Sequence, residues 1–174
     1  MAVRVVRIRK RVSSARLARV ARRLLEAAAL CALATAAPDG RVHINTMYFA
    51  RAEAWTIVWL SASASRHSRN LRERSAAAIA VYDSRQRWGG SDRGIQVFGR
   101  AGPLRGAPAR AALAAYRRRF RGDEATLRRF VAYALRPTRV KLFDEREFGG
   151  GTFVTARVRR DGALEWERTE TYED

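Results

Sequence analysis

The sequence predicts a small antiparallel β-barrel flanked by helices, which is an α+β fold made mainly of strands. Six or more short apolar or alternating stretches are typical of strands, and turn residues join most of them into hairpins. Amphipathic stretches predict helices near the N-terminus and in the middle of the chain. A chain of 174 residues, 47% of them hydrophobic, can also build a single domain around a real core.

We expect that domain to cover residues 1–174. Its parts are a basic helical segment (1–30), a barrel core (31–105), a helical insertion (106–136) and C-terminal strands (137–174). The first helix is predicted to begin after Ser13 or Ser14, because either serine can cap it. One face of this helix is apolar and the other carries arginines. The apolar residues are Leu17, Val20, Ala21, Leu24 and Ala28.

A β-hairpin is predicted over residues 30–51, with its turn at Pro38, Asp39 and Gly40. Proline presets φ in such a turn, and glycine supplies the positive φ. The second strand of the hairpin alternates, with His43, Asn45, Met47 and Phe49 on one face and Val42, Ile44, Thr46 and Tyr48 on the other. Neither face is wholly polar. We therefore expect both to be covered, as in a barrel or at an interface.

The rest of the chain continues this pattern. Strands are predicted over residues 55–62, 76–83, 95–104 and 138–145, with a short helix around 66–74 and a glycine-containing loop over 84–94. Two helices are expected between the last two of these strands. The first buries Leu113, Tyr116 and Phe120; the second buries Leu127, Phe130, Val131 and Ala134 and ends at Pro137. A final hairpin turns at Asp161 and Gly162.

The charge is strongly basic, with a formal net value of +18. Lysine occurs only at positions 10 and 141, so arginine dominates. A compositional bias of the genome and an anionic partner both explain this surplus, and the sequence leaves the choice open. The first 23 residues contain no acid, as in an organellar transit peptide, but they also supply the first helix of the domain. Since acidic residues gather at the C-terminus, we expect the two ends to meet, within one chain or across a dimer.

Several features that are absent from the sequence limit the compartment and the chemistry expected for the protein. Cys31 is the only cysteine, which excludes an intramolecular disulfide and favours the cytoplasm. No apolar run approaches the roughly 18 residues that span a membrane. With Cys31, the histidines His43 and His67 form no recognised ligand spacing, so no metal is expected. The GxSxG, Walker A and GxGxxG patterns are absent, and no residue stands out as a catalytic acid or base.

The best candidate for a site is the stretch that begins at Ser61. A strand is predicted to run into a helix there, and free N–H groups at a helix start favour an anion. Ser61, Ser63 and Ser65 can donate hydroxyl hydrogen bonds, and Arg66 can hold two phosphate oxygens. His67 adds an N–H donor whose charge depends on pH. The alternative is an ordinary N-cap followed by a solvated basic helix.

These elements resemble the pyridoxamine 5'-phosphate oxidase-like family of FMN-binding split barrels, most clearly over residues 25–105. In that family the third strand is followed by a small hydroxyl residue, then Ser-Arg-Lys, then Asn-Leu. Ser61, the Ser65-Arg66 pair and the Asn70-Leu71 pair match this pattern, whereas His67 replaces the usual lysine. The resemblance implies a homodimer that holds FMN at its interface and performs flavin redox chemistry on a small molecule. The implied cofactor contacts are Asn45, Thr46, Met47, Tyr48, Leu60, Ser61, Ser65, Arg66, His67, Asn70, Trp88 and Gln96.

Within this set, the resemblance implies that Ser61, Arg66 and His67 hold the phosphate and that residues 45–48 lie along the ring and ribityl chain. Trp88 stacks on the ring or the substrate, or else covers the core. With histidine in place of lysine, FMN affinity should rise as the pH falls from about 8 to about 6. Asn45 and Ala50 stand where the pyridoxine-phosphate oxidases proper carry basic residues, and the C-terminal signature of those enzymes is not reproduced. We therefore do not expect vitamin B6 oxidation.

Three alternatives stay open. The arginine surplus suits the acidic tail of F420, so an F420-dependent reductase is one. A haem-binding split barrel with His43 or His67 as ligand is another. The third is a non-enzymatic nucleic-acid-binding module that uses the arginine-rich N-terminus. No nucleic-acid-binding motif supports that module, so we expect neither nucleic acid nor membrane as a partner.

Overall fold

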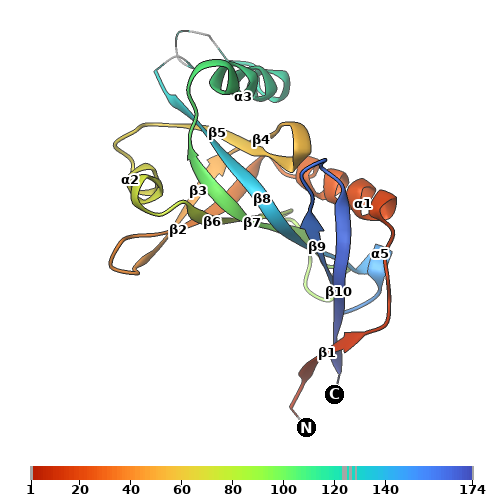
Figure 1. Ribbon diagram of the computed structural model, residues 1–174. Helices are drawn as coiled ribbons and strands as arrows, with labels where there is room; N and C mark the ends of the chain where they lie inside the picture. The colour runs from red at the N-terminus through yellow and green to blue at the C-terminus, as the bar shows by residue number, and fades with distance from the viewer. Residues whose placement is uncertain (1, 123–124, 126, 128, 174) are drawn as a thin grey trace. The chain divides into compact units, whose positions relative to one another are not determined.

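Strands form the largest part of the regular structure in the computed structural model, which describes residues 2–122, 125, 127 and 129–173 (Figure 1). The antiparallel sheet has the strand order β1-β10-β9-β8-β7-β6-β2-β3, and β5 pairs with both β4 and β8. The strands are β1 (Arg4–Ile8), β2 (Leu30–Ala36), β3 (Val42–Tyr48), β4 (Ala50–Arg51), β5 (Ile57–Ser61), β6 (Ala76–Tyr82), β7 (Arg93–Pro103), β8 (Val131–Asp144), β9 (Thr152–Val158) and β10 (Leu164–Glu173). The helices are α1 (Ser14–Glu26), the 3-10 turn η1 (Glu53–Trp55), α2 (Arg66–Glu73), α3 (Gly106–Arg119) and α5 (Glu145–Phe148).

The chain forms two compact units. The first contains residues 1–28, 80–97 and 138–174, and the second contains residues 29–79 and 98–137. Strands β6, β7 and β8 each contribute residues to both units. Within the described residues no helix is both long enough and apolar enough to cross a membrane.

Helix α1 of the first unit forms as the sequence predicts. The Ser13 hydroxyl caps it by accepting a hydrogen bond of 3.3 Å from the backbone N–H of Arg16. Of the predicted apolar face, Leu17, Val20, Ala21 and Leu24 are buried. Leu25 is buried as well, whereas Ala28 lies beyond the end of the helix. Burying these side chains stabilises the helix more than its intrinsic propensity does.

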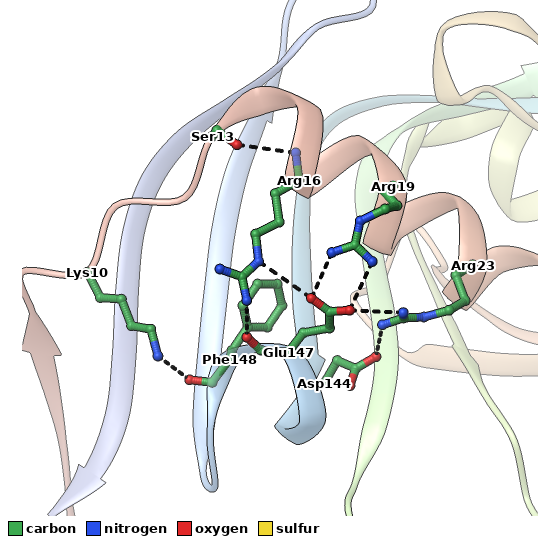
Figure 2. Close-up of polar contacts among 8 residues, drawn as sticks. All are labelled: Lys10, Ser13, Arg16, Arg19, Arg23, Asp144, Glu147 and Phe148. Carbon is green, nitrogen blue, oxygen red and sulfur yellow. Dashed lines mark hydrogen bonds and ion pairs between the residues drawn. The ribbon is translucent and has the colours of Figure 1, made fainter.

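The opposite side of α1 carries an ionic network that joins it to α5 (Figure 2). Arg19 holds the Glu147 carboxylate through two hydrogen bonds, of 3.0 and 2.9 Å. Arg23 bridges that carboxylate, at 2.9 Å, and the buried Asp144, at 2.7 Å. Arg16 adds a third cation 3.4 Å from Glu147. The hydrogen bonds from Arg19, opposed in part by desolvation, lower the pKa of Glu147 to about 2.

Strand β1 was not predicted, but it confirms that the two ends meet within one chain. It pairs with β10, so that Arg4 lies opposite Glu173 and Arg7 opposite Glu170. Beyond the strand, the Thr169 hydroxyl donates a hydrogen bond of 2.6 Å to the carbonyl of Lys10. The basic N-terminal segment is therefore part of the sheet of the first unit and is not a free arm.

In the second unit, the β2–β3 hairpin confirms the predicted turn. Gly40 has a φ of +87°, which a residue with a side chain rarely adopts. Cys31 and Leu33 of β2 are buried, while the outer face of β3 is exposed at Val42, Ile44 and Tyr48. We expected both faces of the hairpin to be covered. Within this unit the inner face is covered and the outer face of β3 is exposed.

Helix α3 also belongs to the second unit, and it lies against β4 and β5 (Figure 1). The contact consists mostly of alanines. Ala112 and Ala115 of the helix are buried with Ala50, Ala132 and Ala134 of the strands. Such small side chains let a helix approach a sheet closely, because no larger group separates the backbones.

The second helix predicted before Pro137 is wrong from Val131 onward, although Leu127 is helical. Val131 and Ala134 belong to strand β8, and Pro137 lies inside that strand. Residues 132–135 are all buried, and a short run that is apolar on every face does not distinguish strand from helix. Residues 126 and 128, on either side of the predicted Leu127, lie outside the described residues.

Replacing Glu147 by glutamine should weaken the attachment of α1. The carboxylate pKa is lowered in the folded chain, so its stabilisation is present above the unfolded pKa and is lost as pH falls through the folded pKa. We expect Glu147→Gln to lower the free energy of unfolding by roughly 1–2 kcal/mol at neutral pH, because the partner arginines are half-exposed.

Urea denaturation at several pH values measures this effect. The difference from wild type should shrink as the pH falls from about 4.5 towards about 2. Glu53→Gln removes an exposed carboxylate that has no ion pair with the described residues, and it serves as the control. A loss of stability that stays constant over the whole pH range would contradict the electrostatic explanation.

Candidate functional site

The junction between β5 and α2 gathers the polar side chains that the sequence singles out. Ser61 ends the strand, and Ser65 caps the helix by accepting a hydrogen bond of 3.3 Å from the backbone N–H of Ser68. His67 Nε2 lies 2.8 Å from Ser61 Oγ and 3.2 Å from Ser65 Oγ. Ser65 Oγ also donates to Ser68 Oγ at 2.8 Å. We call these four side chains the serine–histidine cluster.

His67 is the buried centre of this cluster. It is only 5% exposed, and burial lowers its pKa below the usual value, with a further lowering by the nearby His43. The ring is therefore neutral near pH 7. FMN affinity was expected to change with pH over the range in which an ordinary histidine titrates. That range has to be corrected, because His67 becomes charged at a lower pH than an exposed imidazole does.

Arg66 is the cation best placed to meet a ligand. It is exposed in the first turn of α2, and it makes no side-chain hydrogen bond or ion pair with any described residue. Two other arginines of the same helix are engaged with the preceding loop: Arg69 donates to the carbonyl of Ala64, and Arg72 donates to that of Ser63 at 2.9 Å. All three arginines line a cavity of about 440 Å³.

Asn70 has a different contact from its neighbours. Its side-chain amide donates a hydrogen bond of 3.0 Å to the hydroxyl of Thr35 on β2, and both residues are buried. Thr35 lies opposite His43 in the hairpin register. Asn70 therefore ties α2 to the hairpin that carries the second histidine. Sequence reasoning missed Thr35 and Ser68 as members of the site, although the register set by the predicted turn pairs Thr35 with His43.

The four site residues predicted on β3 are divided between its faces. Asn45 and Met47 are half-buried, whereas Thr46 and Tyr48 are exposed on the outer face. A flat ring lying on one face of the strand can meet only one pair of these side chains, together with the backbone. Leu60 precedes Ser61 on β5, and its side chain lines a cavity that does not include the serine–histidine cluster.

Trp88 and Gln96, the two remaining predicted residues, belong to the first unit. Both are exposed, and Trp88 is completely so, at 103% of its reference surface. The alternative was that Trp88 covers a core. Within the first unit this alternative is wrong, because Trp88 is completely exposed there. The serine–histidine cluster belongs to the second unit, so neither Trp88 nor Gln96 contacts it within a single unit.

Nucleophilic chemistry by the lone thiol is disfavoured. Cys31 is buried, and desolvation raises its pKa to about 12, although Arg119 opposes this shift. Among the described residues, no three His, Cys, Asp or Glu side chains are grouped closely enough to hold a metal ion. The junction instead combines hydroxyl groups, a helix start and an unpaired arginine, which is an arrangement suited to binding an anion.

Solved structures share this architecture. A haem-binding protein from Mycobacterium smegmatis superposes with a TM-score of 0.69 at 21% identity, over 88% of this chain but only 61% of its own length. A haem storage protein from Vibrio cholerae gives 0.59 at 17% identity, over 67% and 86% of the two chains. An F420 reductase gives 0.53 at 25% identity, over 68% and 93%. The fold is a split β-barrel.

A match to a family sequence pattern classifies the protein more narrowly than its fold does. Residues 17–144 match the sequence pattern described as pyridoxamine 5'-phosphate oxidase, and this match covers well over half of the chain. The protein therefore belongs to that family, as the order of its elements implied. No curated protein matches the sequence at a significant level.

The burial of His67 should make stability depend on pH. The folded pKa lies below the unfolded value of about 6.5, so the unfolded chain takes up a proton first and stability falls as the pH drops below about 7. We expect this contribution to have a slope of at most about 1.4 kcal/mol per pH unit. It should disappear in His67→Gln, which keeps a hydrogen-bonding group.

Chemical denaturation between pH 5 and 7.5 measures this slope, since only groups such as histidine titrate there. His43→Gln removes the other histidine and should keep most of the slope. An unchanged slope in His67→Gln would show that His67 is not the group that resists protonation.

Proposed function

We propose that the protein is an FMN-dependent oxidoreductase that acts on a small molecule. The observation that carries this proposal is the unpaired Arg66 beside the serine–histidine cluster, within the part of the chain that matches the family. The resemblance described above implies that the phosphate is bound there. An arginine with no internal partner can place two N–H groups on a phosphate without breaking an existing contact. The start of α2 adds a favourable dipole.

The residues that would hold FMN follow from their positions. Arg66 and the hydroxyl of Ser61 would bind the phosphate, and His67 would orient that hydroxyl. The Ser65 hydroxyl would join them by turning its one proton from Ser68 to the phosphate. The backbone of β3, over residues 45–48, would lie along the ring and the ribityl chain. When bound, FMN supplies the electron-transfer chemistry, while the protein supplies orientation and electrostatics. The substrate stays unassigned.

Two other cofactors have specific support in the site. Arg69 and Arg72 line the cavity beside Arg66, and this group of cations suits the acidic tail of F420. His43 and His67 are two nitrogen donors for haem, but the Nε2 atom of His67 already lies within hydrogen-bond distance of two serines. That contact favours an anion at the junction over a haem iron bound to His67.

The absorption spectrum of the purified protein separates these candidates. Flavin gives paired bands in the near-ultraviolet and the blue, whereas haem gives a Soret band. A colourless protein can be titrated with FMN and with F420 in turn. The proposal fails if the protein carries haem, or if it binds F420 and not FMN.

A homodimer is the second part of the proposal. The outer face of the hairpin exposes Val42 at 72% and Ile44 at 66%, with Tyr48 and Leu30 beside them. This row of apolar side chains on neighbouring strands is larger than the scattered surface residues that a monomer tolerates. A second copy related by a two-fold axis would cover it, and the cofactor would then lie near that interface.

Ile44→Glu tests this dimer, because a charge at the centre of the outer face cannot be buried without a partner. We expect sedimentation to show a dimer for wild type at micromolar concentration and a monomer for the variant. Val5→Glu changes a similarly exposed residue of β1 and should leave the dimer intact. A wild-type monomer that binds FMN would exclude this arrangement.

Arg66→Ala tests the phosphate contact. A charge-assisted hydrogen bond contributes about 1.5–3 kcal/mol, so the loss should weaken FMN binding by at least about tenfold. Riboflavin lacks the phosphate and should bind both proteins almost equally. Fluorescence titration of the apo-protein with the two ligands measures this difference.

Arg22→Ala removes another exposed arginine, from α1, and is the control for net charge. It should leave both affinities close to those of wild type. Equal losses for FMN and riboflavin in Arg66→Ala would show that Arg66 supports the fold or the ring and does not hold the phosphate.

A further inference from the structure

A second cavity lies on the other face of β5, beneath α3. Its volume is about 480 Å³, within the range of about 300–1,000 Å³ that is usual for small-molecule pockets. Apolar walls come from Leu60 of β5, Leu104, Leu113 of α3 and Ala132 of β8. Of the residues proposed to contact the cofactor, only Leu60 reaches it. Because its side chain points into this cavity, any cofactor contact of Leu60 would come from its backbone.

The cavity arises from the way α3 packs. In the middle of the helix, Ala112 and Ala115 pack against the alanines of the strands. Leu113, which follows Ala112, and Ala109, one turn nearer the N-terminus, line the cavity together with the larger Leu60 and Leu104. The cavity therefore lies directly beside the alanine contact.

The lining of this cavity is positively charged. Arg72, Arg105 and Arg110 contribute to it, and the described lining residues include no acidic side chain. Arg105 and Arg110 make no hydrogen bond or ion pair with described residues, and both are exposed. Arg72 gives one of its N–H groups to the Ser63 carbonyl and has others to offer. Apolar walls with unpaired guanidinium groups match a ligand that has an apolar body and one anionic end.

We propose that this cavity binds a small organic acid, with its apolar body against Leu60, Leu104 and Leu113 and its carboxylate at Arg105 and Arg110. The site is separate from the serine–histidine cluster, although Arg72 also lines the cavity beside Arg66. A neutral molecule of the same shape would contact the apolar side chains but leave the arginines without a counter-ion. A cation of that shape would be repelled.

Three isosteric probes test the charge requirement: 4-phenylbutyrate, 4-phenylbutan-1-ol and 4-phenylbutylamine. Isothermal titration calorimetry of the full chain should show one site per chain for the acid. The alcohol should bind at least about tenfold more weakly, because it loses a charge-assisted contact, and the amine should bind more weakly still. Shortening the acid to 3-phenylpropionate removes one buried methylene and should weaken binding by about fourfold.

Matched variants on α3 locate the binding. Leu113→Trp should fill the cavity and reduce the affinity for 4-phenylbutyrate by at least about tenfold, whereas Ala114→Trp on the exposed side should leave it unchanged. Arg110→Gln should weaken the acid but not the alcohol. Arg118→Gln removes an exposed arginine of the same helix that does not line the cavity, and it should weaken neither.

FMN titration of the same variants keeps the two proposals apart. Leu113→Trp should bind FMN as wild type does, which also shows that the variant is folded. Equal affinities for the acid, the alcohol and the amine would overturn the proposal, because the arginines would then play no part. Binding of the acid that survives in Leu113→Trp would overturn it as well, since the acid would then bind elsewhere.

Discussion

The hydrogen bond of 2.8 Å between Ser61 and His67 is the contact on which the candidate site depends. It joins the last residue of β5 to the first turn of α2, and both side chains are buried. Losing either partner would leave the other with only the longer contact to the Ser65 hydroxyl, at 3.2 Å, and a buried polar atom that is poorly bonded costs free energy. Because His67 is fixed, the backbone of its neighbour Arg66 is fixed too. The exposed side chain of Arg66 thus extends from a backbone that is held by the buried contact of its neighbour.

Local chemistry made most of the second unit predictable. The turn at Gly40, the cap at Ser65 and the alternation of β3 each follow from a few neighbouring residues. These signals also set the register of the hairpin, and the register brings Thr35 beside His43. The strand-to-helix junction was predictable for the same reason, since a hydroxyl residue before a basic amphipathic run is a local signal.

The remaining features depend on contacts that are distant in sequence. Strand β1 has no strong alternation of its own, and it is defined by pairing with β10. The start of β8 is apolar on both faces, so periodicity did not distinguish it from a helix. The lowered pKa of His67 likewise arises from burial, which no sequence pattern displays. The cavity beneath α3 reflects side-chain sizes on three elements at once, so it became visible only in the assembled unit.

The pairing of β1 with β10 also affects how the chain folds as it is made. β1 is synthesised before every other described element, and its partner is synthesised after all of them. Long-range pairing of this kind forms slowly, so β1 must wait as an unpaired strand while the rest of the protein emerges. Arg4 and Arg7 suit that interval, because charged residues on a free strand discourage it from pairing with other chains. Arg4 and Arg7 lie opposite glutamates in the folded sheet. The same two arginines thus also protect the incompletely synthesised chain from aggregation.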